Sequence, residues 1–362
     1  MQASSRWQKL FASLLLTFLS AQGNAQETNW NRLISSAKPE GKLVLSGPAD
    51  PLLRKGLPEK FKERFGIVVE YVGAASNDAI GRLRQERLAG LYTTDLMLAG
   101  PTALVSIYSE KMLDPLRPLM LEEILDGRYW KGGKPRFSDP EAKYSLRLAE
   151  RVTALFMINK SIVKREEFRS IHDLTNPRWK GKIVAEDPTR GSAGTGLPMV
   201  LYTSLGEEFI KKLYIDNEVI LSGDRRQMAD WLARGTYPIS MGVHEEEFQR
   251  LQAEGFSLEI INSLADFPGY IAVGAGHLVV VNRAPHPNAA RLFANWLASK
   301  EGLQLYSRLM GEPTMRADVD ESQVPQYMIP KPGVNYIDSA SWEYALKRQA
   351  VSQRLRELLK RK

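Results

Sequence analysis

Short apolar stretches and longer amphipathic stretches alternate along the first part of the chain. The apolar stretches have the length and composition of buried strands and lie at 42–45, 67–72 and 95–98. Two stretches with helical spacing, 57–65 and 76–89, separate them; Ser76 can cap the second, and Gly66 and Gly90 end them. Strands that alternate with helices at this spacing predict a parallel sheet in an α/β fold.

A second series of strands and helices follows an irregular polar stretch that contains several glycines and prolines. Its first apolar stretch, 152–158, predicts one continuous strand. Further strands and one helix are predicted, in chain order, at 183–185, 219–221, 226–233 (the helix) and 237–241. This series predicts a second α/β unit.

The remaining chain begins with an apolar strand at 276–281 and ends with a helix from residue 341 onward. In that last helix Leu346 and Leu355 are among the side chains available to pack. With 362 residues the chain is long enough for two domains. We predict a first lobe at 26–150, a second lobe at 151–265, a return to the first lobe at 266–312, and a C-terminal segment at 313–362 whose helix packs on the lobes.

Residues 1–25 have the pattern of a secretory signal peptide. Arg6 and Lys9 precede an apolar run at 10–19, and small residues around Ala25 offer a cleavage site. We therefore expect these residues to be removed on export. The alternative is an uncleaved membrane anchor, which the shortness of the apolar run disfavours.

The sequence contains no cysteine. Disulfides, thiolate metal sites, a cysteine nucleophile and lipid attachment at a signal-peptide cysteine are therefore excluded. An exported protein without a lipid anchor is expected to be free in the periplasm. The formal charge of +7 falls by two when Arg6 and Lys9 are removed, and the other basic residues are scattered among acidic ones, so no nucleic-acid-binding surface is expected.

Loops of small or polar residues follow the predicted strands. In open α/β sheets ligands bind beyond the carboxyl ends of the strands, so these loops are the candidate binding site. The candidate ligand-binding residues are Ser46, Gly47, Ala75, Ser76, Asn77, Gly100, Asp187, Thr189, Arg190, Gly191, Ser192, Ala193, Gly194, Gly223, Asp224, Arg225, Gly242 and His244.

The loop after the strand at 183–185 has the strongest chemical signal in this set. A strand, a loop of small residues and a helix start can hold an anion on backbone N–H groups, and Arg190 adds a planar charged group. Two alternatives remain open. The glycines can serve only to turn the chain, and Arg190 can pair with Asp187 or Glu186 on the surface.

Enzyme motifs are absent from the sequence. The four histidines have neither metal-ligand spacing nor a recognisable place in a Ser/His/Asp arrangement, and no phosphate loop, dinucleotide fingerprint or nucleophile elbow is present. His286, which precedes a helix between two prolines, is expected to have a structural role. We therefore expect no catalytic residues, no metal site and no cofactor.

Several phrases of the sequence resemble a known family when their order and spacing are taken together. They are Glu40-Gly41-Lys42-Leu43-Val44, Asn176-Pro177 with Trp179-Lys180-Gly181-Lys182-Ile183, His286-Pro287-Asn288-Ala289-Ala290, and Arg316-Ala317-Asp318-Val319. On these residues the chain resembles the bacterial extracellular solute-binding proteins, family 1, of ABC importers, and is most similar to the group that includes ferric-ion, phosphonate and thiamine binders.

This resemblance implies a type II periplasmic-binding-protein-like fold. Such a fold has two α/β lobes joined by two crossover strands, with the ligand cleft between them, and closes on its ligand by hinge motion. The implied partners are a small-molecule ligand and the transmembrane permease subunits of an ABC transporter, without nucleic acid, and the implied state is a monomer.

The sequence departs from the ferric-ion binders at their metal ligands. Those proteins typically use adjacent tyrosines shortly after the strand that corresponds to 237–241, and this chain has no Tyr-Tyr pair. Glu245, Glu246 and Glu247 stand there instead and predict the solvated start of a helix.

Loops rich in Ser, Gly, Thr and Asn, together with Arg190, Arg225 and Arg226, favour a small anionic or zwitterionic solute. Three alternatives stay open: a ferric-ion carrier without the tyrosine pair, a ligand-sensing partner of a membrane receptor, and, more remotely, a periplasmic enzyme on the same scaffold.

Overall fold

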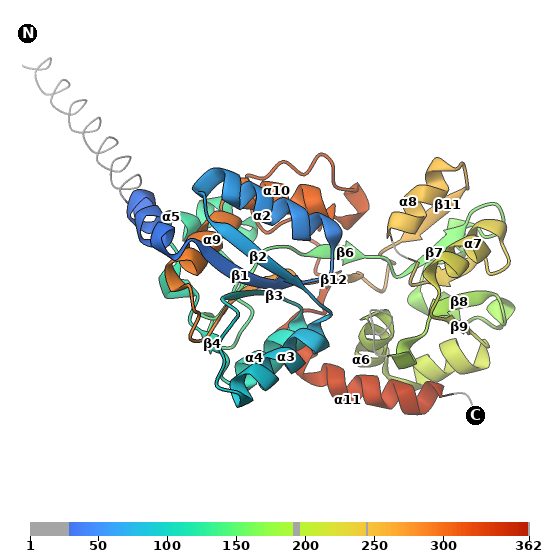
Figure 1. Cartoon of the computed structure of the whole chain (residues 1–362). Coiled ribbons are helices and arrows are strands. Elements are labelled where there is room, and N and C mark those ends of the chain that lie inside the picture. Colours follow the sequence, from blue (N-terminus) through green and yellow to red (C-terminus); the bar gives the residue numbers. More distant parts are fainter. Residues whose placement is uncertain (1–28, 191–195, 244, 361–362) are drawn as a thin grey trace, which may run out of the picture. The chain divides into compact units, whose positions relative to one another are not determined.

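The computed structural model describes residues 29–190, 196–243 and 245–360, and these form two compact units (Figure 1). The first unit comprises the chain up to Leu148 together with Ala275–Met310 and Thr314–Glu321, and the second comprises Ala149–Gly274, Gly311–Pro313 and the chain from Ser322 onward. The predicted signal peptide and the candidates Gly191, Ser192, Ala193, Gly194 and His244 lie outside the described residues.

A six-stranded sheet forms the centre of the first unit. Its main order is β2-β1-β3-β13-β4, and β5 also pairs with β13. The strands are β1 (Lys42–Gly47), β2 (Val68–Gly73), β3 (Leu96–Ala99), β4 (Leu113–Asp114), β5 (Ser145–Arg147) and β13 (His277–Val281). The prediction of a parallel sheet is correct for β1, β2 and β3, but the whole sheet is mixed because β13 runs antiparallel to β3, β4 and β5.

Helices pack around this sheet in the first unit. A helix at 29–37 precedes α2 (Pro51–Phe65), α3 (Ser76–Leu88), α4 (Pro101–Ser109), α5 (Glu122–Leu125), α9 (Pro287–Ala298) and α10 (Lys300–Met310), with short 3₁₀ segments at Lys38–Glu40, Arg117–Leu119, Gly127–Tyr129 and Lys131–Gly133. Gly66 ends α2 in the left-handed conformation, as predicted. Ser76 is the first helical residue of α3 rather than its cap, since Ala75 occupies the N-cap position and makes no side-chain cap hydrogen bond.

The second unit contains a five-stranded sheet of order β11-β7-β10-β8-β9. The strands are β7 (Phe156–Asn159), β8 (Ile183–Glu186), β9 (Ile220–Ser222), β10 (Ile239–Met241) and β11 (Leu258–Ile261). β8 is parallel to both β9 and β10, whereas β7 is antiparallel to β10 and β11. The carboxyl ends of β8, β9 and β10 therefore lie at one edge of the sheet.

A separate three-stranded sheet, β14-β12-β6, corrects one prediction. It consists of β6 (Arg151–Thr153), β12 (Tyr270–Ala272) and β14 (Ile337–Asp338). The stretch 152–158 was expected to be one strand, but β6 and β7 are separate because each joins a different sheet and two residues between them belong to neither.

Helices of the second unit are α6 (Gly196–Ile210), α7 (Arg225–Arg234), α8 (Glu245–Ala253) and α11 (Trp342–Leu359). Shorter 3₁₀ segments lie at Arg165–Glu167, Ile171–Thr175, Pro177–Trp179, Pro188–Arg190 and Gln326–Met328, and a π-helical segment at Lys211–Asp216 continues α6. The predicted helix start at Glu245 is correct. Leu355 and Leu359 of α11 are buried in the main apolar cluster of this unit, whereas Leu346, which was expected to pack, is 55% exposed. Across the described ranges, every helix is too short or too polar to cross a bilayer.

Candidate functional site

A hollow of about 620 Å³ lies at the carboxyl ends of β8 and β9 in the second unit. It is lined by Glu186 at the end of β8, by Asp187 and Arg190 in the following turn, and by Gly223, Asp224, Arg225 and Arg226 where β9 leads into α7. Parallel pairing of β8 and β9 places both loops at the same edge of the sheet. The structure thus gathers Asp187, Arg190, Gly223, Asp224 and Arg225 of the candidate set, and adds Glu186 and Arg226.

Each arginine of the hollow faces a carboxylate. The Arg225 guanidinium donates to Oε1 of Glu186 at 3.0 Å, and Glu186 itself is buried. Arg226 lies 3.7 Å from Glu247 of α8. The pair with Glu186 orients the Arg225 guanidinium, whereas the Arg226 side chain is 88% exposed. The lining carries both positive and negative groups, which suits a solute that carries both an anionic group and hydrogen-bond donors.

The alternative that Arg190 pairs with Asp187 is present in the structure, at 3.6 Å between Nε and Oδ2. The Arg190 side chain is 67% exposed, and a pair of this kind contributes about 0 to 1 kcal/mol to stability. It therefore leaves the guanidinium free to exchange its partner for a solute anion.

Two carboxylates shape the loops of the hollow through backbone hydrogen bonds. Asp187 accepts hydrogen bonds from the N–H of Thr189 at 2.8 Å and from its hydroxyl at 2.7 Å, which fixes the turn that carries Arg190. Asp224 caps α7 by accepting from the N–H of Gln227 at 3.0 Å. Thr189 therefore acts as a support of the turn, and it does not line the hollow.

Gly223 and Gly242 lie at two close approaches on this edge. A Cβ at position 223 would stand 2.2 Å from Nη1 of Arg190, so only glycine leaves room for the guanidinium. Gly242 has a φ of 110°, and a Cβ there would stand 2.8 Å from Cβ of Glu186. Gly242 thus supports the position of Glu186. The sequence had not indicated this role for Gly242.

The candidates of the first unit lie at the corresponding edge of its own sheet. Ser46 and Gly47 end β1 and are buried, Gly100 is the N-cap of α4 after β3, and the exposed Ala75, Ser76 and Asn77 lie at the start of α3 after β2. Because β1, β2 and β3 are parallel, these residues follow the same ends of neighbouring strands.

Tyr71 of β2 explains why position 47 is glycine. Its hydroxyl donates to the carbonyl of Pro48 at 2.9 Å, and a Cβ on Gly47 would stand 2.4 Å from that hydroxyl oxygen. Burial, with a smaller contribution from the charge of Asp50, raises the pKa of Tyr71 well above its ordinary value. Tyr71 is therefore a neutral phenol.

A buried polar cluster that sequence reasoning missed surrounds His277 at the same edge. His277 pairs with Ala99 at the end of β3 and with Arg147 of β5, and both His277 and Arg147 are buried. The hydroxyl of Ser138 lies 3.0 Å from Nε2 of His277 and 3.3 Å from Nε of Arg147. Burial, then the charges of Arg147 and Arg136, lower the pKa of His277 to about 3, so the ring stays neutral. The one signal in the sequence is the position of His277 at the start of an apolar strand, which indicates a buried histidine.

The expected structural role of His286 is confirmed by its contacts. The fully buried Asp95 accepts hydrogen bonds from the N–H of Val44 at 2.7 Å and from the N–H of His286 at 2.6 Å, and its Oδ2 lies 2.9 Å from Nδ1 of His286. Within the described part of the chain, no group of three or more His, Asp or Glu side chains has the geometry of a metal site.

Comparison with known sequences identifies the family of this chain. The profile of a family described as bacterial extracellular solute-binding protein matches residues 57–328. A protein of Haemophilus influenzae, described as uncharacterized, is 24% identical over 286 residues, which cover 75% of this chain and 76% of that protein.

Solved structures resemble this chain at low sequence identity. Iron-bound HitA from Pseudomonas aeruginosa is 14% identical with a TM-score of 0.67, covering 87% of this chain and 99% of that chain. The ferric binding protein from Campylobacter jejuni (17%, TM-score 0.67) and the fructose-6-phosphate-bound AfuA from Actinobacillus pleuropneumoniae (16%, TM-score 0.64) each cover 88% of this chain and 99% of their own. The fold is therefore the α/β periplasmic-binding-protein fold, built here on mixed sheets.

Proposed function

Because this chain belongs to the family of bacterial extracellular solute-binding proteins, we propose that it captures a small anionic or zwitterionic solute in the periplasm and delivers it to the permease of an ABC importer. In this proposal the protein is exported through a cleaved signal peptide, carries no lipid anchor and performs no chemistry on the solute. The hollow beside β8 and β9 holds the charged group of the solute.

One observation supports this assignment above the others: three guanidinium groups, those of Arg190, Arg225 and Arg226, line a single hollow. Guanidinium groups bind phosphates, phosphonates and carboxylates through paired hydrogen bonds. The carboxylates of Asp187 and Asp224 lie in the same lining and can accept hydrogen bonds from hydroxyl or amino groups of the solute. An organophosphate, a phosphonate or an amino acid-like zwitterion fits this combination.

We further propose that capture involves closure of the two units about the passages at 148–153 and 264–273, because the chain passes between the units in or next to these segments, at Leu148–Ala149 and Gly274–Ala275. Small-angle scattering of the protein with and without a solute that binds should show compaction. An unchanged radius of gyration at saturation would contradict closure.

Titration calorimetry with fructose 6-phosphate, inorganic phosphate and a phosphonate tests the proposed function. We expect at least one of these probes to bind, and Arg190→Ala to weaken its binding by roughly 2 to 5 kcal/mol, as expected for loss of a charge-assisted hydrogen bond in a binding site. The melting temperature of the free protein should hardly change, because the ion pair between Arg190 and Asp187 is exposed.

Arg234→Ala is the matched control, since Arg234 is an exposed arginine at the other end of α7 and does not line the hollow. Wild-type affinity in the Arg190→Ala variant would move the anion site elsewhere. Equal losses in both variants would show a nonspecific effect of charge and would also contradict the assignment.

A ferric-ion carrier is the second candidate function, favoured by the structural likeness to iron-bound HitA and to the ferric binding protein of Campylobacter jejuni. The lack of adjacent tyrosines in the sequence disfavours it, because phenolate oxygens suit Fe(III). A sensing role and a periplasmic enzyme on the same scaffold rest on no specific observation of the site.

A further inference from the structure

The C-terminal helix α11 contacts both the turn that follows β8 and the helix α6 that comes after that turn. It contacts Pro188–Arg190 before the residues that the structure leaves undescribed, and α6 after them. Leu355 and Leu359 of α11 are buried in the same apolar cluster as Ala185 of β8 and Leu197 of α6. α11 therefore packs against the strand and the helix that flank the turn of the hollow.

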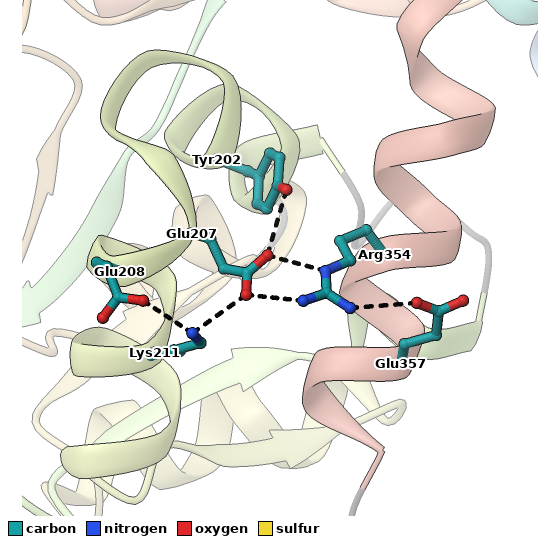
Figure 2. Close-up of polar contacts among 6 residues, drawn as sticks. All are labelled: Tyr202, Glu207, Glu208, Lys211, Arg354 and Glu357. Atoms are coloured by element: carbon teal, nitrogen blue, oxygen red, sulfur yellow. Dashed lines mark hydrogen bonds and ion pairs between the residues drawn. The ribbon is translucent and has the colours of Figure 1, made fainter.

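An ion pair fixes the last turns of α11 to α6 (Figure 2). Nε and Nη2 of Arg354 each lie 2.8 Å from a different oxygen of the Glu207 carboxylate. Lys211 also pairs with Glu207, at 3.1 Å. The hydrogen bonds from Arg354 and Lys211 lower the pKa of Glu207 to about 2, so the carboxylate stays ionised at all but strongly acidic pH.

Glu207 occupies a special position in α6. It follows Gly206, which breaks the helix with a φ of 83° and a ψ of 176°, so Glu207 begins the second part of α6. The Tyr202 hydroxyl of the first part donates to the Glu207 carboxylate at 3.4 Å (Figure 2). The carboxylate therefore connects both parts of α6 with Arg354 of α11.

The geometry of this pair distinguishes it from an ordinary surface ion pair. Isolated exposed pairs hold few atoms in place and contribute little. Here the guanidinium uses two donors against both carboxylate oxygens, an arrangement that fixes relative orientation as well as distance. Glu207 is also the more buried partner, with 23% of its side chain exposed against 46% for Arg354.

We propose that the Glu207–Arg354 pair positions the hollow of the second unit. It holds α11 on α6, and α11 in turn holds Pro188–Arg190, so that the guanidinium of Arg190 is presented at a fixed place. Arg354 is then a positioning residue that acts through Arg190 without contacting the solute. The effect of the Glu207–Arg354 pair on solute binding rests on the proposed function. Its effect on the position of Pro188–Arg190 does not.

Amide hydrogen exchange of the protein without solute tests the coupling directly. The N–H of Thr189, which donates to Asp187, is the reporter of the turn. We expect Arg354→Ala to speed exchange at Thr189 and in the first turns of α6 by roughly five-fold or more through local opening. Exchange in β1 and β2 of the first unit should stay unchanged. Glu207→Gln should reproduce the effect.

Lys347→Ala is the control, because Lys347 is an exposed cation of α11 and is not one of the described residues that form ion pairs with Glu207 or Arg354, which are Lys211 and Glu357 besides each other. It should leave exchange at Thr189 as in the wild type, and Arg354→Lys, which keeps the charge, should recover part of the protection. Wild-type exchange at Thr189 in the Arg354→Ala variant overturns the proposal, as does an equal effect of Lys347→Ala.

Titration with fructose 6-phosphate separates this proposal from the proposed function. If the wild type binds the probe, Arg354→Ala should weaken binding several-fold and Lys347→Ala should not. Faster exchange with unchanged affinity would overturn the link between the ion pair and solute binding. If the wild type binds none of the probes, the assignment of the hollow fails, and the exchange result alone decides the coupling.

Discussion

The guanidinium of Arg190 lies against Gly223, where a Cβ would stand 2.2 Å from Nη1. The two residues come from loops that follow neighbouring parallel strands, so their contact joins the two walls of the hollow. Because the obstructing atoms are the far end of a flexible side chain, a methyl group at position 223 would displace the guanidinium with little effect on the backbone.

We therefore predict that Gly223→Ala weakens binding of the probe that the wild type binds while leaving the melting temperature within a degree or two, as is usual for surface substitutions away from the core. The effect should vanish in an Arg190→Ala background, because the displaced group is then absent. Titration calorimetry on the two single variants and the double variant measures this. Additive losses would show that Gly223 acts independently of Arg190.

The grouping of these residues was predictable from the sequence because it depends on a general property of α/β sheets. Small and polar residues after the strands that became β8 and β9 indicated loops at one edge. Which carboxylate orients which arginine was not predictable. Glu186 is the last residue of β8, and only the packing of Gly242 and Arg225 around it shows its place in the hollow.

Two differences from the predicted fold concern strands whose sheet or direction depends on the strands they pair with. The apolar stretch that became β6 and β7 has the composition of one strand, but its halves pair with different sheets, which local sequence does not reveal. The direction of β13 in the first sheet is likewise a property of the chain's path and not of its own apolar residues.

Asp95 is predicted to be essential for the stability of the first unit. Asp95→Ala leaves the N–H groups of Val44 and His286 without their acceptor, and a buried donor without a partner costs about 1 to 3 kcal/mol each. We expect urea denaturation to show a loss of roughly 2 to 6 kcal/mol in the free energy of unfolding. Asp216→Ala, at an exposed position, is the control and should change stability by less than about 0.5 kcal/mol. A loss of that small size in Asp95→Ala would contradict the structural role.

His277 is predicted to make stability depend on pH. Its pKa is about 3 in the folded protein and about 6.5 in the unfolded chain, so the unfolded chain binds the proton first as the pH falls. The free energy of unfolding should therefore decrease as the pH falls from about 6.5 toward 3, and His277 should contribute up to about 1.4 kcal/mol per pH unit to this decrease. Above about pH 6.5, His277 should make no contribution to the pH dependence of stability.

Chemical denaturation between pH 7.5 and pH 4.5 tests this contribution, with His277→Gln as the variant and His172→Gln, at an exposed histidine, as the control. The slope of stability against pH should become shallower in His277→Gln and remain as in the wild type in His172→Gln. An unaltered slope in His277→Gln would mean that the folded protein protonates His277 as readily as the unfolded chain does.

Ferric ion is predicted to bind, if at all, without the visible charge-transfer band of iron–phenolate centres. Fe(III) suits phenolate oxygen, but the sequence has no adjacent tyrosines, and Tyr71 at the strand-end edge of the first unit is held as a neutral phenol. Its hydroxyl proton is already donated to the carbonyl of Pro48, and burial opposes ionisation. Adding Fe(III) with carbonate or phosphate and recording the visible spectrum of the wild type and of Tyr71→Phe tests this. A strong band in the wild type that Tyr71→Phe abolishes would show that iron overcomes the burial of this phenol, and would favour the ferric-ion carrier over the proposed function.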